Sequence, residues 1–171
     1  MLRSVLLIFL VLQVGFFVLA WVAATPFQLG PWAMQIVPDG MTLDARQMMP
    51  TSQRLLGIAV GLPPIVLLIF GMLKLEQTLR QFQRGAIFAK RTIAYLRAFA
   101  GATFLSVIFA NVEKPLRAMV FNLASNSKAY SITFDITSNE ILLILVCGLF
   151  YLIAWIMHEG RRLAEENEGF I

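Results

Sequence analysis

The stretch ILLILVCGLFYLIAWIM, at residues 141–157, decides the fold, because its seventeen consecutive positions contain no charged side chain. An α-helix needs about 20 apolar residues, with a lower limit of about 17, to cross about 30 Å of hydrocarbon. A single soluble domain of 171 residues is not expected to contain an uncharged apolar segment of this length. The segment therefore predicts a transmembrane helix.

Three further apolar blocks precede this segment, at about residues 4–23, 55–75 and 93–112. The first block is longer than the apolar core of a signal peptide, which spans about 7–15 residues, so we expect an uncleaved anchor. The whole chain is 58% hydrophobic and 14% charged, whereas soluble domains are about 45–50% apolar and about 25% charged. We therefore predict an all-α membrane fold, in which residues 1–171 form one domain of four transmembrane helices.

The basic residues predict how the chain is oriented in the membrane. Nine of the fourteen Lys and Arg residues lie on the side that carries both termini and the connection between the second and third blocks. The other five lie on the opposite side. Basic residues close to the ends of membrane helices stay in the cytoplasm. We therefore expect cytoplasmic termini, with the connections 24–54 and 113–140 outside.

The two outer connections carry signals of local structure. MQIVPDGMTLD, at 34–44, places a Pro-Asp-Gly turn between two short apolar runs and favours a β-hairpin. YSITFDIT, at 130–137, alternates apolar and polar residues as a half-buried strand does. We predict a small extracytoplasmic β-structure in which these segments pair. Residues 113–125 instead favour a helix that continues the third block past Pro115.

Proline and glycine mark two special positions on the second block. Pro63 and Pro64 lie at its middle and remove the helical hydrogen bonds of the Ala59 and Val60 carbonyls, so we predict a kink there. The kink forms either a hinge or binding niche, or a bend that suits packing. Beyond the membrane the block continues as an amphipathic helix, and Gly85 is placed to cap its end.

The residue types that support catalysis do not converge in this sequence. His158 is the only histidine, and the Glu165-Glu166 pair lies in a polar tail without metal-ligand histidines. Ser106 and Thr103 have no histidine or lysine base nearby, and we expect their hydroxyls to bond within the helix or to a neighbouring helix. We therefore expect no enzyme, no metal site and no cofactor.

Ion-coupled transport and nucleic-acid binding are also disfavoured. Ionisable side chains are absent from the centre of every block, whereas coupled carriers place them there. Asn111, Glu113 and Lys114 cluster at the outer end of the third block, where we expect an interfacial position. The inner connection is basic but contains no nucleic-acid-binding module, so its charges favour topology, lipid anchoring or an acidic protein partner.

The segments LRQFQRGAIFAKRTIAYLRAFAG (79–101) and IAWIMHEGRRLAEENEGFI (153–171) carry a family resemblance. They resemble the bacterial membrane family called domain of unknown function 2975, whose pattern has spaced phenylalanines around a glycine, a leucine-arginine pair and an acidic Leu-x-Glu-Glu-Asn tail. The matching positions are Phe82, Gly85, Phe88, Leu96, Arg97, Leu163, Glu165, Glu166 and Asn167. The resemblance implies a four-helix protein of the bacterial cytoplasmic membrane.

The same resemblance implies a protein partner. Genes of this family often lie next to the gene of a very small helix-turn-helix regulator, and neighbouring bacterial genes often encode proteins that act together. It implies that the membrane protein holds or inactivates that regulator. We expect the docking to occur at the inner face made by 76–92 and 158–171, because this face combines a basic connection, an acidic tail and apolar side chains. The residues that we expect to bind the partner are Leu79, Arg80, Phe82, Arg84, Gly85, Ile87, Phe88, Arg161, Arg162, Leu163, Glu165, Glu166 and Asn167. The alternative is a small permease or envelope subunit that handles an apolar or peptide-like compound.

Overall fold

The computed structural model describes residues 2–22, 27–29, 32–34, 36, 47–125 and 137–168. Its long helices are α1 (Leu2–Val22), α3 (Thr51–Gln83), α4 (Lys90–Ser125) and α5 (Ser138–Glu168). Each of these four helices is long and apolar enough to cross a membrane. The part of the chain that the structure describes therefore contains the four predicted helices of membrane-spanning length, in the predicted order.

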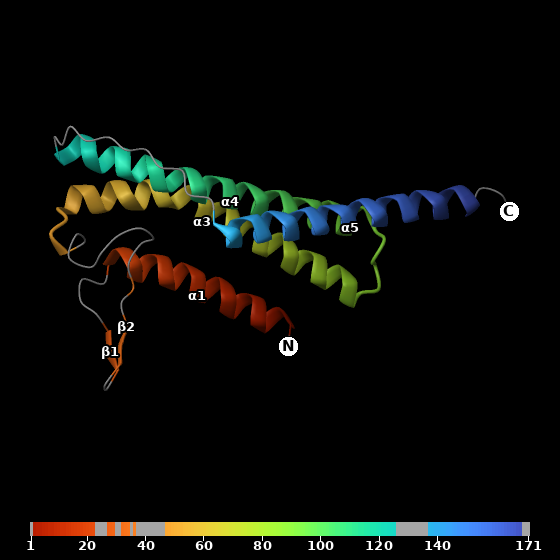
Figure 1. Cartoon of the computed structure of the whole chain (residues 1–171). Helices are drawn as coiled ribbons and strands as arrows, with labels where there is room; N and C mark the ends of the chain where they lie inside the picture. The colour runs from red at the N-terminus through yellow and green to blue at the C-terminus, as the bar shows by residue number, and fades with distance from the viewer. Residues whose placement is uncertain are drawn as a thin grey trace.

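The helices pack in the order α1, α3, α4, α5, so that α4 lies between α3 and α5 (Figure 1). One cluster of buried apolar side chains joins α4 to α5. There Ile93, Leu96 and Phe99 of α4 pack against Ala154 and Met157 of α5. This antiparallel pair of helices fixes the position of α5 along the bundle.

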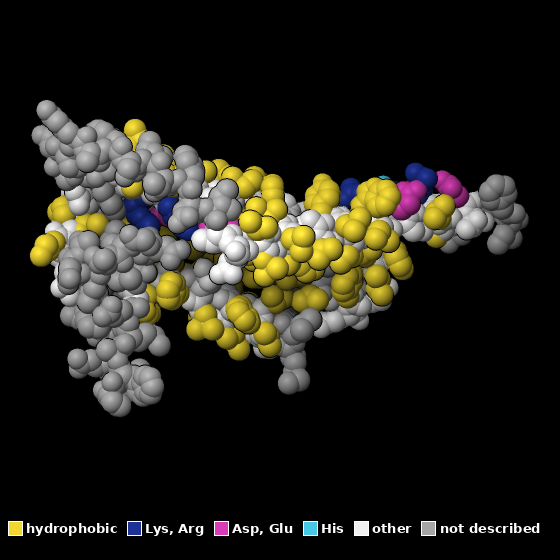
Figure 2. Space-filling view, in the orientation of Figure 1, with side chains coloured by type: hydrophobic (Ala, Val, Ile, Leu, Met, Phe, Trp, Pro, Cys, Tyr) yellow, Lys and Arg dark blue, Asp and Glu magenta, His cyan; other side chains and the backbone are white. Residues whose placement is uncertain are grey.

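Most apolar side chains of the four helices point outward rather than into this core. Val11 and Leu12 of α1 are exposed, as are Ile141, Leu142 and Leu145 of α5. Figure 2 shows hydrophobic side chains over the middle of the molecule and charged ones towards its ends. Such a surface would drive association in water but is well solvated by hydrocarbon, since lipid tails are as apolar as leucine. The chain is therefore suited to a multi-pass position in a membrane.

The helices run up and down, so the start of α1, the α3–α4 connection and the end of α5 lie towards one end of the bundle (Figure 1). We call this the terminal end. The helices α3, α4 and α5 contain 33, 36 and 31 residues, more than the about 20 that a span requires. The expected continuations are thus confirmed: α3 extends to Gln83, α4 past Pro115 to Ser125, and α5 into the tail.

The connection between α3 and α4 is a well-defined turn. Gly85 has a φ of 72°, its N–H donates to the Phe82 carbonyl at 3.0 Å, and the Ala86 N–H donates to the Gln81 carbonyl at 3.0 Å. These two bonds satisfy carbonyls at the end of α3, and the positive φ favours a residue without a Cβ atom. The Thr92 hydroxyl then donates to the Ala86 carbonyl at 2.7 Å. The predicted glycine cap is confirmed.

Helix α3 continues through Pro63 and Pro64 without ending. In Figure 1 its first and second halves run in different directions. The two missing N–H groups give the physical reason, because a helix that lacks these hydrogen bonds bends easily. The Ser106 hydroxyl of α4 donates to the Pro64 carbonyl at 2.8 Å, which ties the bent region to the neighbouring helix.

The outer β-structure differs from the sequence prediction. Strands β1 (Phe27–Leu29) and β2 (Trp32–Met34) form an antiparallel hairpin. Gly30 and Pro31 separate them in the sequence, and this dipeptide favours a turn. The hairpin described thus ends where the predicted one over 34–44 begins. Apart from Met34 and residue 36, that predicted hairpin lies outside the described residues, as do residues 130–136.

Thr137 was predicted as the last residue of a strand, and that assignment is wrong. It precedes α5, and its N–H donates to the Glu140 carboxylate at 2.7 Å. The Thr137 carbonyl accepts from the N–H groups of Glu140 and Ile141 at 3.1 and 3.3 Å. Thr-Ser-Asn-Glu is a capping-box sequence, in which the side chain of the third helical residue bonds the backbone of the cap. The helix-start signal outweighs the strand pattern at this position.

Candidate functional site

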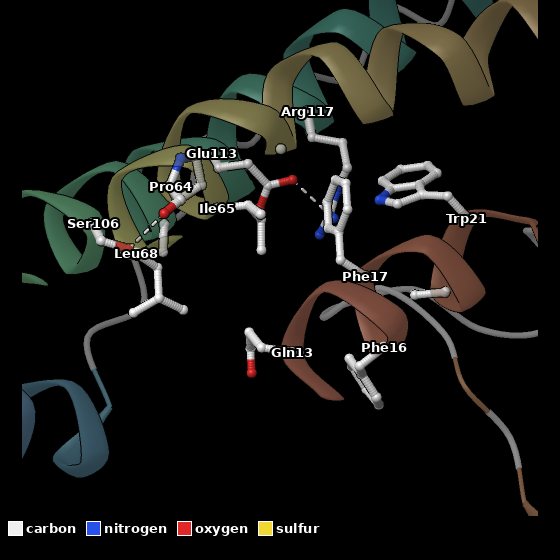
Figure 3. Close-up of a pocket in the computed structure, with 13 residues that line it drawn as sticks. Gln13, Phe16, Phe17, Trp21, Pro64, Ile65, Leu68, Ser106, Glu113 and Arg117 are labelled. Carbon is white, nitrogen blue, oxygen red and sulfur yellow. Dashed lines mark hydrogen bonds and ion pairs between the residues drawn. The ribbon is translucent and has the colours of Figure 1, made fainter. Parts of the chain in front are cut away.

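The structure has a pocket of about 320 Å³ between α1, α3 and α4 (Figure 3). Pro64 lines it, so the pocket lies beside the kink at which a binding niche was one of the alternatives. Aromatic side chains of α1 face α3 and α4 across it. The lining residues are Gln13, Phe16, Phe17, Ala20, Trp21, Gly61, Pro64, Ile65, Leu68, Ser106, Ala110, Glu113 and Arg117. Ligand sites are typically concave, mostly apolar, and carry a few placed polar groups. This pocket is likewise lined mostly by apolar side chains and carries a few polar ones.

Two glycines of α3 let α1 approach at the pocket. A Cβ atom added at Gly57 would overlap the indole ring of Trp21, and one at Gly61 would lie 2.9 Å from the ring of Phe17. Small residues four positions apart allow such close contact between membrane helices. Gly57 and Gly61 form this GxxxG motif. The motif was present in the sequence and is the signal that would have located the α1–α3 contact.

A buried ion pair lies at one side of the pocket. The Arg117 Nη1 atom is 3.0 Å from the Glu113 Oε1 atom, and the two side chains are only 8% and 13% exposed. The guanidinium also lies over the Trp21 ring, 5.9 Å from its centroid, a cation–π geometry. The Glu113 side chain thus faces the bundle, and its expected position at the outer interface of the membrane stays a prediction. The Nζ atom of Lys114 instead lies 3.1 Å from the Oε1 atom of Glu140 on α5.

The hydroxyl groups on α4 have structural partners. The Thr103 hydroxyl donates to the Phe99 carbonyl of its own helix at 2.9 Å, and the Ser106 hydroxyl donates to the Pro64 carbonyl of α3. Both outcomes confirm the expectation of bonding within the helix or to a neighbour. Within the described residues no three His, Cys, Asp or Glu side chains are placed to hold a metal ion. The pocket is thus suited to binding a small amphipathic molecule.

The residues predicted to bind a partner form two patches at the terminal end. The first, which we call the turn patch, covers residues 79–88. Arg80 is exposed and its Nε atom is 2.5 Å from the Glu76 carboxylate. Phe82, Ile87 and Phe88 are exposed, whereas Leu79 is half-buried. Arg84 and Gly85 are exposed in the turn itself.

The second patch, which we call the tail patch, covers residues 161–167 of α5. Arg161 pairs with Glu165, and Arg162 pairs with Glu166 at 3.4 Å and with Glu159 at 2.6 Å. The expected same-face pairs at four-residue spacing are therefore confirmed. Leu163 and Asn167 are exposed. Figure 2 shows these acidic and basic side chains on the projecting end of α5.

The two patches flank the first turns of α4 and do not form one continuous surface. Helices α3 and α5 each pack on α4, and their backbones do not approach each other closely within the described residues. Residues of the tail patch do line a hollow with the start of α4. A partner that contacts both patches must therefore span the beginning of α4.

Comparison with known proteins finds no matching family model, no matching curated protein and no matching solved structure. The resemblance of residues 79–101 and 153–171 to the family named above therefore remains a prediction from the sequence. The proposals that follow rest on that resemblance and on the geometry of the described residues.

Proposed function

We propose that this chain is an integral membrane interaction protein with a binding role rather than a catalytic one. In this proposal it belongs to the family called domain of unknown function 2975 and holds a small cytosolic helix-turn-helix regulator at its terminal end. One observation carries the proposal: α5 runs past the start of α4 and carries its charged residues out of the apolar bundle (Figures 1 and 2). A span alone does not require this extension.

The two patches supply the chemistry of a protein interface. The turn patch offers exposed aromatic and aliphatic side chains, of which Phe88 is 56% exposed. Aromatic anchors of this kind commonly dominate the energy of an interface. The tail patch offers both signs of charge in fixed ion pairs. Charge complementarity selects among partners more than it adds affinity. A regulator held here would be kept from its DNA.

Reversing two charges of the turn patch tests this function. We expect Arg80→Glu with Arg84→Glu to release a small helix-turn-helix regulator from the membrane, because a shift of a few kcal/mol moves a bound population to a mostly free one. The measurement is the share of tagged regulator that sediments with membranes, together with expression of its target genes. Lys128→Glu, in the connection 113–140 that we expect on the outer side of the membrane, is the control and should retain the regulator. Identical sedimentation and output with and without this protein would show the proposal to be wrong.

We propose that the terminal end lies in the cytoplasm of a bacterial cell, with the chain in the cytoplasmic membrane. The nine-to-five distribution of basic residues supports this orientation. In a Cys147→Ala background, single cysteines at the exposed positions Ser52 and Asn167 are treated in whole cells with a thiol reagent that does not cross membranes. We expect labelling at position 52 only; labelling at position 167 only would reverse the topology.

We also propose that the outer connections form more β-structure than β1 and β2, involving residues 35–44 and 130–136. The hairpin at 27–34 supports this, because it shows that the first connection forms antiparallel strands. An isolated two-stranded hairpin is marginal, and further strands stabilise it. An experimental structure with a helix at 130–136 would contradict the proposal.

The second candidate function is the handling of a small apolar or peptide-like compound, as in a permease or envelope subunit. The pocket between α1, α3 and α4 favours it, because its aromatic walls and its Glu113–Arg117 pair suit an amphipathic molecule. Gly57 offers the substitution that tests this candidate, since the Trp21 ring both lines the pocket and contacts α3 there.

A further inference from the structure

A second hollow, of about 480 Å³, lies at the terminal end between the first turns of α4 and the last part of α5. Basic side chains dominate it. Lys90, Arg97, His158, Arg161 and Arg162 line it, and Glu165 is the one acidic residue of its lining. The charges of these residues therefore do not balance within the hollow.

Two of the cations make no ion pair among the described residues, although Lys90 lies close enough to Glu165 to interact with its charge. Arg161 pairs with Glu165, and Arg162 pairs with carboxylates of its own helix. By contrast, Lys90 and Arg97 make no ion pair within the residues that the structure describes. The Nε atom of Arg97 is buried and has no hydrogen-bond acceptor there. A guanidinium N–H that is buried without an acceptor is costly, so an anion in the hollow would satisfy it.

The position of the hollow indicates where such an anion comes from. Ile93 and Ala94 lie between Lys90 and Arg97 on its wall, at the point where the apolar span of α4 begins. Trp155, one turn before His158 on α5, is exposed, and tryptophan is enriched at the level of lipid headgroups. Basic pockets between membrane helices at the cytoplasmic surface bind the headgroups of anionic lipids.

We propose that this hollow binds a phosphate group, with Lys90 and Arg97 as the principal cations, and that the phosphate belongs to an anionic phospholipid of the surrounding leaflet. Arg97 donates from its buried Nε–H, and Lys90 adds a point charge at the exposed edge. Guanidinium groups suit phosphate oxygens because their N–H donors form a planar fork. The site does not depend on whether a protein docks at the terminal end.

The test uses the full chain in a neutral detergent and measures its thermal stability and lipid adducts by native mass spectrometry. We expect phosphatidylglycerol to raise the unfolding temperature and to form a retained adduct, and phosphatidylcholine to do neither. Inorganic phosphate at millimolar concentration is the second arm. Stabilisation by phosphatidylglycerol alone supports the lipid source, and stabilisation by inorganic phosphate as well supports the phosphate site with a soluble source. No effect of either ligand overturns the proposal.

Substitutions test whether Lys90 and Arg97 bind the phosphate group. Lys90→Gln with Arg97→Gln should weaken phosphatidylglycerol binding by about tenfold or more, because two cations near the membrane surface are removed. Arg91→Gln removes the same charge from an exposed neighbour that does not line the hollow and should leave binding within about twofold. Lys90→Gln alone, at an exposed position, keeps the test valid if the double variant fails to fold. An equal loss in Arg91→Gln and Lys90→Gln would mean diffuse attraction and would refute a specific site.

Discussion

Replacing Arg117 with methionine is expected to lower the free energy of unfolding by about 3–5 kcal/mol, the cost of removing one partner from a buried ion pair. The Glu113 carboxylate would keep its place between α1, α3 and α4 with its side chain only 13% exposed. Methionine retains the length of the apolar stem but supplies no donor. The variant also loses the contact of the guanidinium with the Trp21 ring. Equilibrium unfolding in detergent micelles measures the change.

The matched control is Arg162→Met, which removes an arginine from an ion pair of the same four-residue spacing. The Arg162 and Glu166 side chains are 59% and 58% exposed, and exposed pairs contribute about 0–1 kcal/mol. Adding Glu113→Gln to Arg117→Met should restore part of the lost stability, because the unpaired charge is then removed. Equal small losses in the two methionine variants would show that the Glu113–Arg117 pair is effectively solvated.

The transmembrane helices were predictable because a membrane span places a direct limit on sequence. Seventeen consecutive uncharged positions at 141–157 are typical of a membrane span and of few other structures. Local rules also predicted the ends of helices: Gly85 adopts the positive φ that a glycine cap requires, and α4 continues past Pro115 as expected. These outcomes depend on a few neighbouring residues along the chain.

The pocket was not predictable in the same way, because it depends on contacts between three helices. The Glu113–Arg117 spacing is visible in the sequence, but which face of α4 it occupies depends on where α1 and α3 lie. Thr137 shows a different difficulty. Its segment satisfies both a strand period and a capping box, and the hydrogen bond from its N–H to Glu140 shows that the capping box prevails.

Replacing Gly57 with leucine is expected to displace Trp21 and separate the end of α1 from α3. A Cβ atom at this position already overlaps the indole ring, and overpacking a close contact costs about 1–3 kcal/mol. Helix α1 is vulnerable because its backbone packs closely on α3 alone among the described helices. The unfolding temperature in detergent should fall, although leucine is itself a better helix former than glycine.

The same variant decides whether the pocket binds a ligand. In lipid nanodiscs, a small apolar probe with a photoreactive diazirine should label Phe17 and Ile65, which line the pocket, more than the lipid-facing Val11. Gly57→Leu should abolish this excess, because Trp21 no longer closes the pocket. Gly15→Leu is the control, since nothing lies within 4 Å of a Cβ atom at that position of α1. It should not lower the stability and should leave the labelling unchanged. If the two leucine variants behave alike, the contact at Gly57 does not hold α1 in place. Equal labelling of Phe17, Ile65 and Val11 in the unaltered chain would show that the pocket does not bind the probe.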